Sequence, residues 1–196
     1  MFMALGRSSF FIIILTVIIT SISSLNANDD ILLNSLETDE WFYDIDKENG
    51  LVGMMRNGKI THGDKILFLI DTRNCDIVRE SFTFYTMMNH PNIISMEERT
   101  IGVNINGDNI GTKIQFVEPF LSGYAVMFDM GQYWINDHID FYKDTKKYAV
   151  KLFNQKNFLA DKYFDVKFNE WDMSEFGKHL KVAQNKCKML HQTLKS

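Results

Sequence analysis

Residues 77–86 read IVRESFTFYT and contain the pattern that decides the fold class. Val78, Phe82 and Phe84 occupy even positions, and polar residues stand between them. Because successive side chains of a strand point to opposite faces of a sheet, this alternation predicts a strand with one face in the core and one in water. The polar side chains of the opposite face are Arg79, Ser81 and Thr83.

The same period of two residues recurs along the chain. Alternate residues are apolar in the segments 101–105, 124–130, 148–152 and 164–168, and in 110–116 with the exception of Thr112. The dipeptides that tolerate the positive φ angles of tight hairpin turns are Asn49-Gly50, Asn57-Gly58 and Asn106-Gly107. Strands separated by such turns indicate antiparallel pairing. We therefore expect a mainly β domain, built as an antiparallel β-sandwich or a closed barrel.

The period changes towards the C-terminus, where apolar residues recur at steps of four and three. These residues are Phe176, Leu180, Ala183, Cys187 and Leu190. The spacing is typical of the apolar stripe of an amphipathic helix. Asp172 and Glu175 have the spacing of a capping box, with Asp in place of Ser or Thr, and set the helix start just after Trp171. We predict one helix over about residues 173–191, packed on the sheet.

The chain contains two cysteines, Cys75 and Cys187, which are 112 positions apart. Cys187 lies on the apolar stripe of the predicted helix, and Cys75 follows a predicted buried strand over 66–70. In an oxidising compartment a single disulfide is expected, and it would join the terminal helix to the sheet. The alternatives are two buried free thiols or a nucleophilic cysteine, although the chain has no Cys-x-x-Cys pair.

The composition is that of one ordinary globular domain, with 45% hydrophobic residues and a net charge of −4 over 196 residues. An acidic chain of this kind has no reason to bind nucleic acid, because phosphate recognition requires a basic face. No nucleic-acid partner is therefore expected.

The first 27 residues have the order of a secretory signal peptide: Arg7 precedes an apolar run over 10–19, and a more polar stretch follows. Cleavage after Ala27 is favoured, with Ser23 as the alternative. An uncleaved anchor is the other interpretation, but a membrane span requires about 20 apolar residues. We predict a single domain over 28–196, in the periplasm or outside the cell, without membrane contact after signal removal.

The segment Asp137-His138-Ile139-Asp140 is the candidate for metal or acid–base chemistry. On a strand, His138 and Asp140 would share one face and reach a common metal ion or each other. Two ligands are too few to define a site, so both are weak candidates. The signatures Gly-x-Ser-x-Gly, His-Glu-x-x-His and Gly-x-Gly-x-x-Gly do not occur. No cofactor is expected, and an enzyme is the less expected class.

Trp41, Phe42 and Tyr43 are three consecutive aromatic residues. On a strand they cannot all face one core, so either another element covers the second face or an aromatic side chain is left for binding. These three residues are the predicted binding surface, because aromatic side chains dominate the energetics of interfaces. The first functional hypothesis is non-covalent recognition of a protein or an envelope component.

A carrier of a small apolar ligand is the alternative function. A signal peptide, consecutive up-and-down strands and a terminal helix resemble the lipocalin plan in outline, in which an apolar ligand is held inside a barrel. The Gly-x-Trp opening of that family is absent, since Asp39 and Glu40 precede Trp41. A carrier requires a cavity of about 300–1,000 Å³. A metal-dependent or acid–base hydrolase that uses His138 and Asp140 is the weaker alternative.

Overall fold

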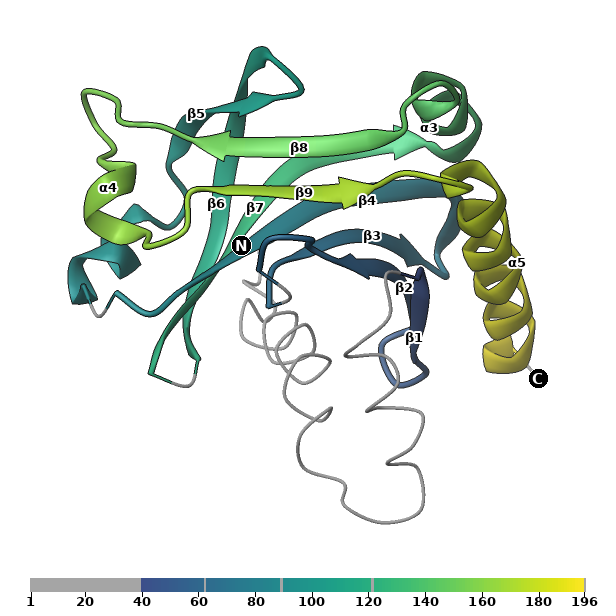
Figure 1. Cartoon of the computed structure of the whole chain (residues 1–196). Helices are drawn as coiled ribbons and strands as arrows, with labels where there is room; N and C mark the ends of the chain where they lie inside the picture. The colour runs from purple at the N-terminus through teal and green to yellow at the C-terminus, as the bar shows by residue number, and fades with distance from the viewer. Residues whose placement is uncertain (1–39, 62, 89, 121, 196) are drawn as a thin grey trace, which may run out of the picture.

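The computed structural model describes residues 40–61, 63–88, 90–120 and 122–195 (Figure 1). The predicted signal peptide lies outside these residues. The strands are β1 (Phe42–Asp46), β2 (Leu51–Asn57), β3 (Lys65–Asp71), β4 (Asn74–Thr86), β5 (Thr100–Ile105), β6 (Asp108–Phe120), β7 (Gly123–Trp134), β8 (Lys147–Leu152) and β9 (Phe168–Asp172). The helices are η1 (Pro91–Met96), α3 (Ile135–Tyr142), α4 (Ala160–Tyr163) and α5 (Phe176–Lys195).

The described strands form one antiparallel sheet in the order β1-β2-β3-β4-β7-β6-β5-β8-β9. The sheet curls into a half-barrel, and α5 packs on it (Figure 1). The predicted mainly β, antiparallel architecture with a C-terminal helix is confirmed. Asn106 and Gly107 both have positive φ, as the predicted hairpin turn between β5 and β6 requires.

The inner face of the central strand β4 is buried as predicted, because Val78, Phe82 and Phe84 are inaccessible to solvent. The expectation of a wet opposite face is wrong, since Ser81 and Thr83 are only 3% and 5% exposed. Strands β3 and β7 flank β4, so the small side chains on its outer face are covered by larger neighbours. A second apolar cluster lies outside the main core and consists of Met55, Leu67, Phe116 and Met127.

The predicted strand over 164–168 is displaced in the structure. Strand β9 begins only at Phe168, after the short helix α4, and its inward residues are Asn169 and Trp171. An asparagine at an inward position interrupts the apolar alternation, which explains why the sequence pattern stopped too early. Phe164 is nevertheless buried, in the core beside α4.

Helix α5 buries the predicted stripe, and all of its five apolar residues are inaccessible or nearly so. The helix starts at Phe176, later than the predicted start at about residue 173, because Glu175 has a φ of +58°, which is outside the helical region. It extends to Lys195. Asp172 accepts a hydrogen bond from the Ser174 backbone N–H in the preceding turn. Within the described residues no helix is both long and apolar enough to cross a membrane.

The disulfide between Cys75 and Cys187 joins the start of β4 to α5. Gln184 Nε2 donates a hydrogen bond of 2.8 Å to Asp76 Oδ1 beside it, and Lys188 Nζ lies 3.3 Å from the same oxygen. The predicted staple between the terminal helix and the sheet is therefore present in the structure.

Removal of the disulfide tests its contribution to stability. Replacing both cysteines by serine should lower the free energy of unfolding by up to about 4–5 kcal/mol, because a cross-link over a loop of this length restricts the unfolded chain. Urea unfolding of the double variant, with the reduced wild-type protein as a control, measures this loss. An unchanged unfolding midpoint would show that the tertiary contacts of α5 suffice.

A polar latch joins β9 to the loop between β2 and β3. Asn169 Nδ2 donates to Asp64 Oδ2 at 2.7 Å and to the Thr61 carbonyl, and Asn169 Oδ1 accepts from the Ile60 N–H at 3.0 Å. Asp64 Oδ1 accepts from the Tyr85 N–H at 2.6 Å. Asp64 and Asn169 are both fully buried. This latch connects the β9 edge of the curled sheet to the loop between β2 and β3.

The latch predicts a pH dependence of stability. Burial raises the pKa of Asp64 from 3.8 to about 7, although its two hydrogen bonds oppose the shift. The folded protein therefore holds this proton more tightly than the unfolded chain, so the stabilisation is complete below pH about 4 and is lost as the pH rises to about 7. A shift of this size corresponds to about 4 kcal/mol.

The measurement is the free energy of unfolding in urea between about pH 4 and pH 8, for the wild type and for Asp64→Asn. In the variant, the free energy of unfolding should no longer fall with rising pH through the titration of Asp64, because asparagine does not titrate. This expectation holds whatever the absolute stability of the variant. Identical slopes for the two proteins would assign the pH dependence to other groups.

Candidate functional site

Glu80 carries a carboxylate into the core from the inward face of β4, between Val78 and Phe82. The side chain is 2% exposed. His138 Nε2 lies 2.9 Å from Glu80 Oε2. The Tyr142 hydroxyl donates to the same carboxylate, at 3.1 Å from Oε1 and 3.2 Å from Oε2. Glu80 thus connects the central strand with two side chains of helix α3.

Helix α3 follows β7 without a linking residue and presents one face to the core. Ile135, His138 and Tyr142 are spaced by three and four positions, and all three are buried. The prediction of a strand over 137–140 is wrong. On a helix, residues two positions apart point to nearly opposite sides, so Asp140 is exposed while His138 faces Glu80. The structure does not bring His138 and Asp140 together.

The sheet opens next to this helix because β6 and β7 diverge. Their last pair is Lys113 with Asp129, after which β6 continues beside β5 and β7 continues beside β4. A β-bulge marks the divergence: Glu80 pairs with Gly131 and Ser81 with Asp129, which leaves one residue of β7 unopposed. Gly131 has a φ of +107°, a backbone conformation that favours glycine.

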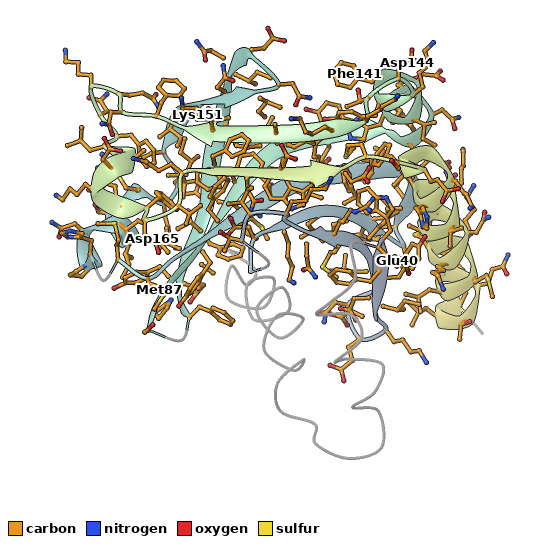
Figure 2. All side chains as sticks on the ribbon, in the orientation of Figure 1. Glu40, Met87, Phe141, Asp144, Lys151 and Asp165 are labelled. Atoms are coloured by element: carbon orange, nitrogen blue, oxygen red, sulfur yellow. A yellow bond between two sulfur atoms is a disulfide. The ribbon has the colours of Figure 1, made fainter. Side chains whose placement is uncertain are left out.

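A cavity of about 510 Å³ lies where the two strands separate, and we call it the β6–β7 cavity. Its apolar lining residues from the sheet are Ile105, Ile110 and Met130. Its aromatic lining residues are Tyr133, Trp134, Phe141, Tyr142 and Tyr148. Glu80 and His138 form its buried polar end. Phe141, which projects from α3 at the outer surface (Figure 2), is 74% exposed, and Trp134 is 58% exposed.

The aromatic rings at the polar end are packed in a fixed arrangement. The ring of Tyr133 stacks on that of His138 at 4.5 Å between centroids, and the Tyr133 hydroxyl donates to the Met130 carbonyl. Tyr142 meets His138 edge to face at 4.9 Å. Phe176, the first residue of α5, contacts the rings of both His138 and Tyr142. Helix α5 therefore packs against α3 through Phe176.

The tyrosine hydroxyls of the cavity remain protonated donors near neutral pH. Burial raises the pKa of Tyr142 and of Tyr148 well above the ordinary range, and the charge of Glu80 adds to both shifts. Burial and, secondarily, the charges of Glu80 and Asp129 also raise the pKa of Tyr133. None of these three residues has the lowered pKa of a tyrosine nucleophile.

Two buried polar atoms of the cavity lack a hydrogen bond of standard geometry within the described residues. The Tyr148 hydroxyl is one of them. His138 Nε2 is the other, since it is close to Glu80 but not aligned with it. A buried polar group without a well-formed hydrogen bond costs free energy. The Tyr148 hydroxyl and His138 Nε2 both belong to the polar cluster around Glu80.

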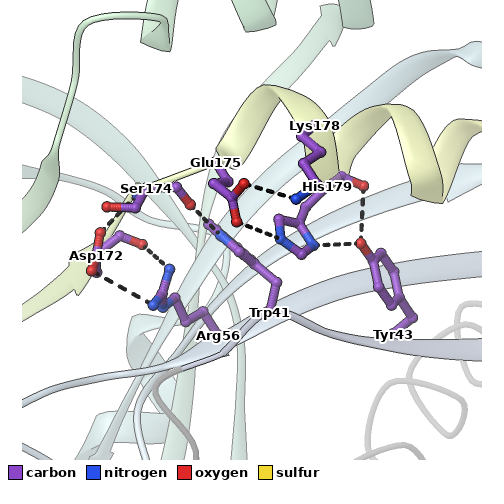
Figure 3. A network of polar contacts seen from close by, with 8 residues as sticks. All are labelled: Trp41, Tyr43, Arg56, Asp172, Ser174, Glu175, Lys178 and His179. Atoms are coloured by element: carbon purple, nitrogen blue, oxygen red, sulfur yellow. Dashed lines mark hydrogen bonds and ion pairs between the residues drawn. The ribbon is translucent and has the colours of Figure 1, made fainter.

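The predicted binding surface at Trp41, Phe42 and Tyr43 is a docking point for α5 (Figure 3). Trp41 is 7% exposed, and its indole N–H donates to the Ser174 carbonyl. The prediction is wrong for Trp41, because a buried ring is not a surface. Phe42 points to the other side of the sheet and packs against the second apolar cluster. Both faces of β1 are therefore used in packing, as the strand geometry allowed.

The Tyr43 hydroxyl lies 2.7 Å from His179 Nδ1, and Glu175 Oε2 lies 3.9 Å from the other ring nitrogen (Figure 3). The row of carboxylate, imidazole and hydroxyl has the order of a proton relay. Burial raises the pKa of Tyr43 and lowers that of His179, which disfavours both ionised forms. The row therefore joins β1 to α5 rather than activating a nucleophile.

The structure provides little for metal or nucleophilic chemistry. Among the residues that the structure describes, no group of three His, Cys, Asp or Glu side chains is placed to hold a metal ion. Both cysteines are consumed in the disulfide. The arrangement at the β6–β7 cavity is suited to holding a molecule by packing and hydrogen bonds.

Glu80 and the aromatic residues around it were not predicted as a site from the sequence. One signal was present: positions 78, 80, 82 and 84 share a face, and the second of them is a glutamate between buried apolar residues. A charged residue at an inward position is rarely buried without a partner. The partner residues are on α3, distant in sequence.

Comparisons of this chain with known protein families, with curated proteins and with solved structures found no match. The interpretation of the site therefore depends on its geometry alone.

The bulge at Gly131 is expected to be essential for the shape of the site. Gly131→Ala should destabilise the protein by about 1–3 kcal/mol, because an L side chain is strained at this φ, although the new Cβ would make only an ordinary contact with Tyr133. Gly111→Ala is the matched control, since its new Cβ would make only an ordinary contact with Thr100. Thermal unfolding of both variants measures the difference. Equal stability of the two would mean that β7 adapts without the bulge.

Proposed function

We propose that the protein is a non-covalent carrier of a small, largely apolar molecule, which occupies the β6–β7 cavity. The observation that supports this most is a cavity of about 510 Å³ with five aromatic residues in its lining and a polar group at its buried end. This volume lies within the range of about 300–1,000 Å³ typical of small-molecule sites. Convergent polar groups at one end would orient the ligand.

The exposed aromatic rings at the mouth of the β6–β7 cavity favour binding of a ligand. Trp134 and Phe141 are large apolar side chains that water surrounds on much of their surface. A ligand that extends from the buried end to the mouth would remove part of this surface from water, at about 25 cal/mol per Å². The cavity therefore offers both a driving force and a fixed orientation.

The setting that we propose for this carrier is a periplasm or the extracellular medium. The disulfide between Cys75 and Cys187 supports an oxidising compartment. The signal-like order of the first 27 residues supports export.

Recognition of a protein or an envelope component is the second candidate function, and the same mouth supports it. Trp134 at 58% and Phe141 at 74% exposure are residue types that anchor protein interfaces. A partner side chain would then enter the cavity in place of a free ligand. Binding of a small molecule in isolation distinguishes the two.

The test of the carrier function is titration with the fluorescent apolar probe N-phenyl-1-naphthylamine. The wild type should bind one probe molecule with enhanced fluorescence. Ile110→Trp places a large ring in the lining and should weaken probe binding by about tenfold or more. The ring would occupy the space in which the probe makes its contacts. Val182→Trp is the control, since Val182 is partly exposed on α5 and does not line the cavity.

No saturable probe binding by the wild type would contradict a carrier of apolar molecules. An equal effect of the two tryptophan variants would place the probe elsewhere on the protein. A circular dichroism spectrum of each variant establishes that the fold is retained.

A further inference from the structure

We propose that the molecule held in the β6–β7 cavity is an organic cation, with an ammonium group against Glu80 and an apolar body between the aromatic rings. This inference rests on the proposed carrier function and specifies its ligand class. It is carried by the signs of the charges in the lining, by the burial of Glu80 and by the aromatic walls.

The charges that face the cavity have one sign. Glu80, Asp108 and Asp137 line it, and the described lining residues include neither lysine nor arginine. His138 is the only basic side chain among the described lining residues. Low-dielectric walls focus the field of such carboxylates into the cavity. The site therefore attracts positive charge and repels an anion.

Glu80 is a buried carboxylate with one basic side chain beside it, His138. Of the described side chains, only His138 forms an ion-pair contact with it, and the nitrogen of that contact is not aligned for a hydrogen bond. The Tyr142 hydroxyl donates to Glu80 but carries no positive charge. A buried carboxylate is costly unless a cation accompanies it. An ammonium group in the cavity would supply that cation.

The walls favour an organic cation over a metal ion. The rings of Tyr133, Trp134, Phe141, Tyr142 and Tyr148 surround the space, and the faces of such rings attract ammonium groups. A metal ion requires several converging oxygen or nitrogen ligands, and no group of three is present among the described residues. An ammonium group that bears methyl or methylene groups satisfies both the charge and the apolar walls.

The experiment compares three compounds of similar size by displacement of N-phenyl-1-naphthylamine from the full protein. They are phenyltrimethylammonium, its neutral isostere tert-butylbenzene and the anion benzenesulfonate. The cation should displace the probe at a concentration about tenfold or more below the concentration that the neutral compound requires. The anion should not displace the probe.

Two variants test which residues cause the preference for the cation. Glu80→Gln retains the shape of the side chain and one acceptor oxygen for the Tyr142 hydroxyl but removes the charge, so affinity for the cation should fall about tenfold or more while the neutral compound is unaffected. Trp134→Leu, at an exposed position, should weaken the cation selectively and keeps the test valid if Glu80→Gln does not fold. Asp144→Asn is the control, because Asp144 (Figure 2) is an exposed carboxylate that does not line the cavity.

The outcomes separate the two proposals. Equal displacement by the cation and the neutral compound would overturn the cation inference and leave the carrier function standing. A preference for the cation that survives both Glu80→Gln and Trp134→Leu would also overturn it. Failure of the probe itself to bind would overturn the carrier function and the cation inference together.

Discussion

The pairing of β4 with β7 across a bulge is the constraint on which the site depends. Arg79 and Glu80 are neighbours on β4 and point to opposite faces of the sheet. Arg79 forms two hydrogen bonds with Asp129 on the outer face, at 2.9 and 2.8 Å, and so fixes β7 just before the bulge. Glu80 holds α3 on the inner face, just after it. Two adjacent side chains thus contact β7 and the helix that follows it, on either side of the bulge.

This arrangement has a cost in stability that apolar packing must offset. A straight β7 would continue its ladder with β6, and a leucine in place of Glu80 would match its neighbours Val78 and Phe82. The chain instead has a bulge with a glycine at positive φ and a buried carboxylate at the same point of the sheet. Groups of this kind collect at functional sites, where geometry is maintained by the surrounding structure. Here α5 provides that support through Phe176.

The overall architecture could be predicted because it depends on local periodicity. Strands with a period of two, glycine-containing turns and a terminal helical stripe are visible in short windows of sequence, and the burial of Phe82, Phe84 and Leu180 follows from them. The disulfide was predictable because Cys187 lies on the buried stripe. These features require no knowledge of which strands become neighbours.

The site could not be predicted because it depends on long-range placement. Glu80 and Tyr142 are separated by 62 positions, and their contact follows from the strand order and the bulge. Helix α3 has eight residues, too few to show a helical period beside the strand that precedes it. Its stripe includes a histidine, which does not register as apolar, so alternation assigned His138 and Asp140 to a strand.

The disulfide also determines what a cut of the backbone would do. Cys75 precedes every residue that lines the β6–β7 cavity, from Glu80 to Tyr148, and Cys187 follows them all. The cystine therefore closes a covalent ring around the whole site. A single cut of the backbone anywhere in that ring leaves two fragments that remain joined, so both walls of the cavity stay in one molecule and the nicked chain is not free to diffuse apart.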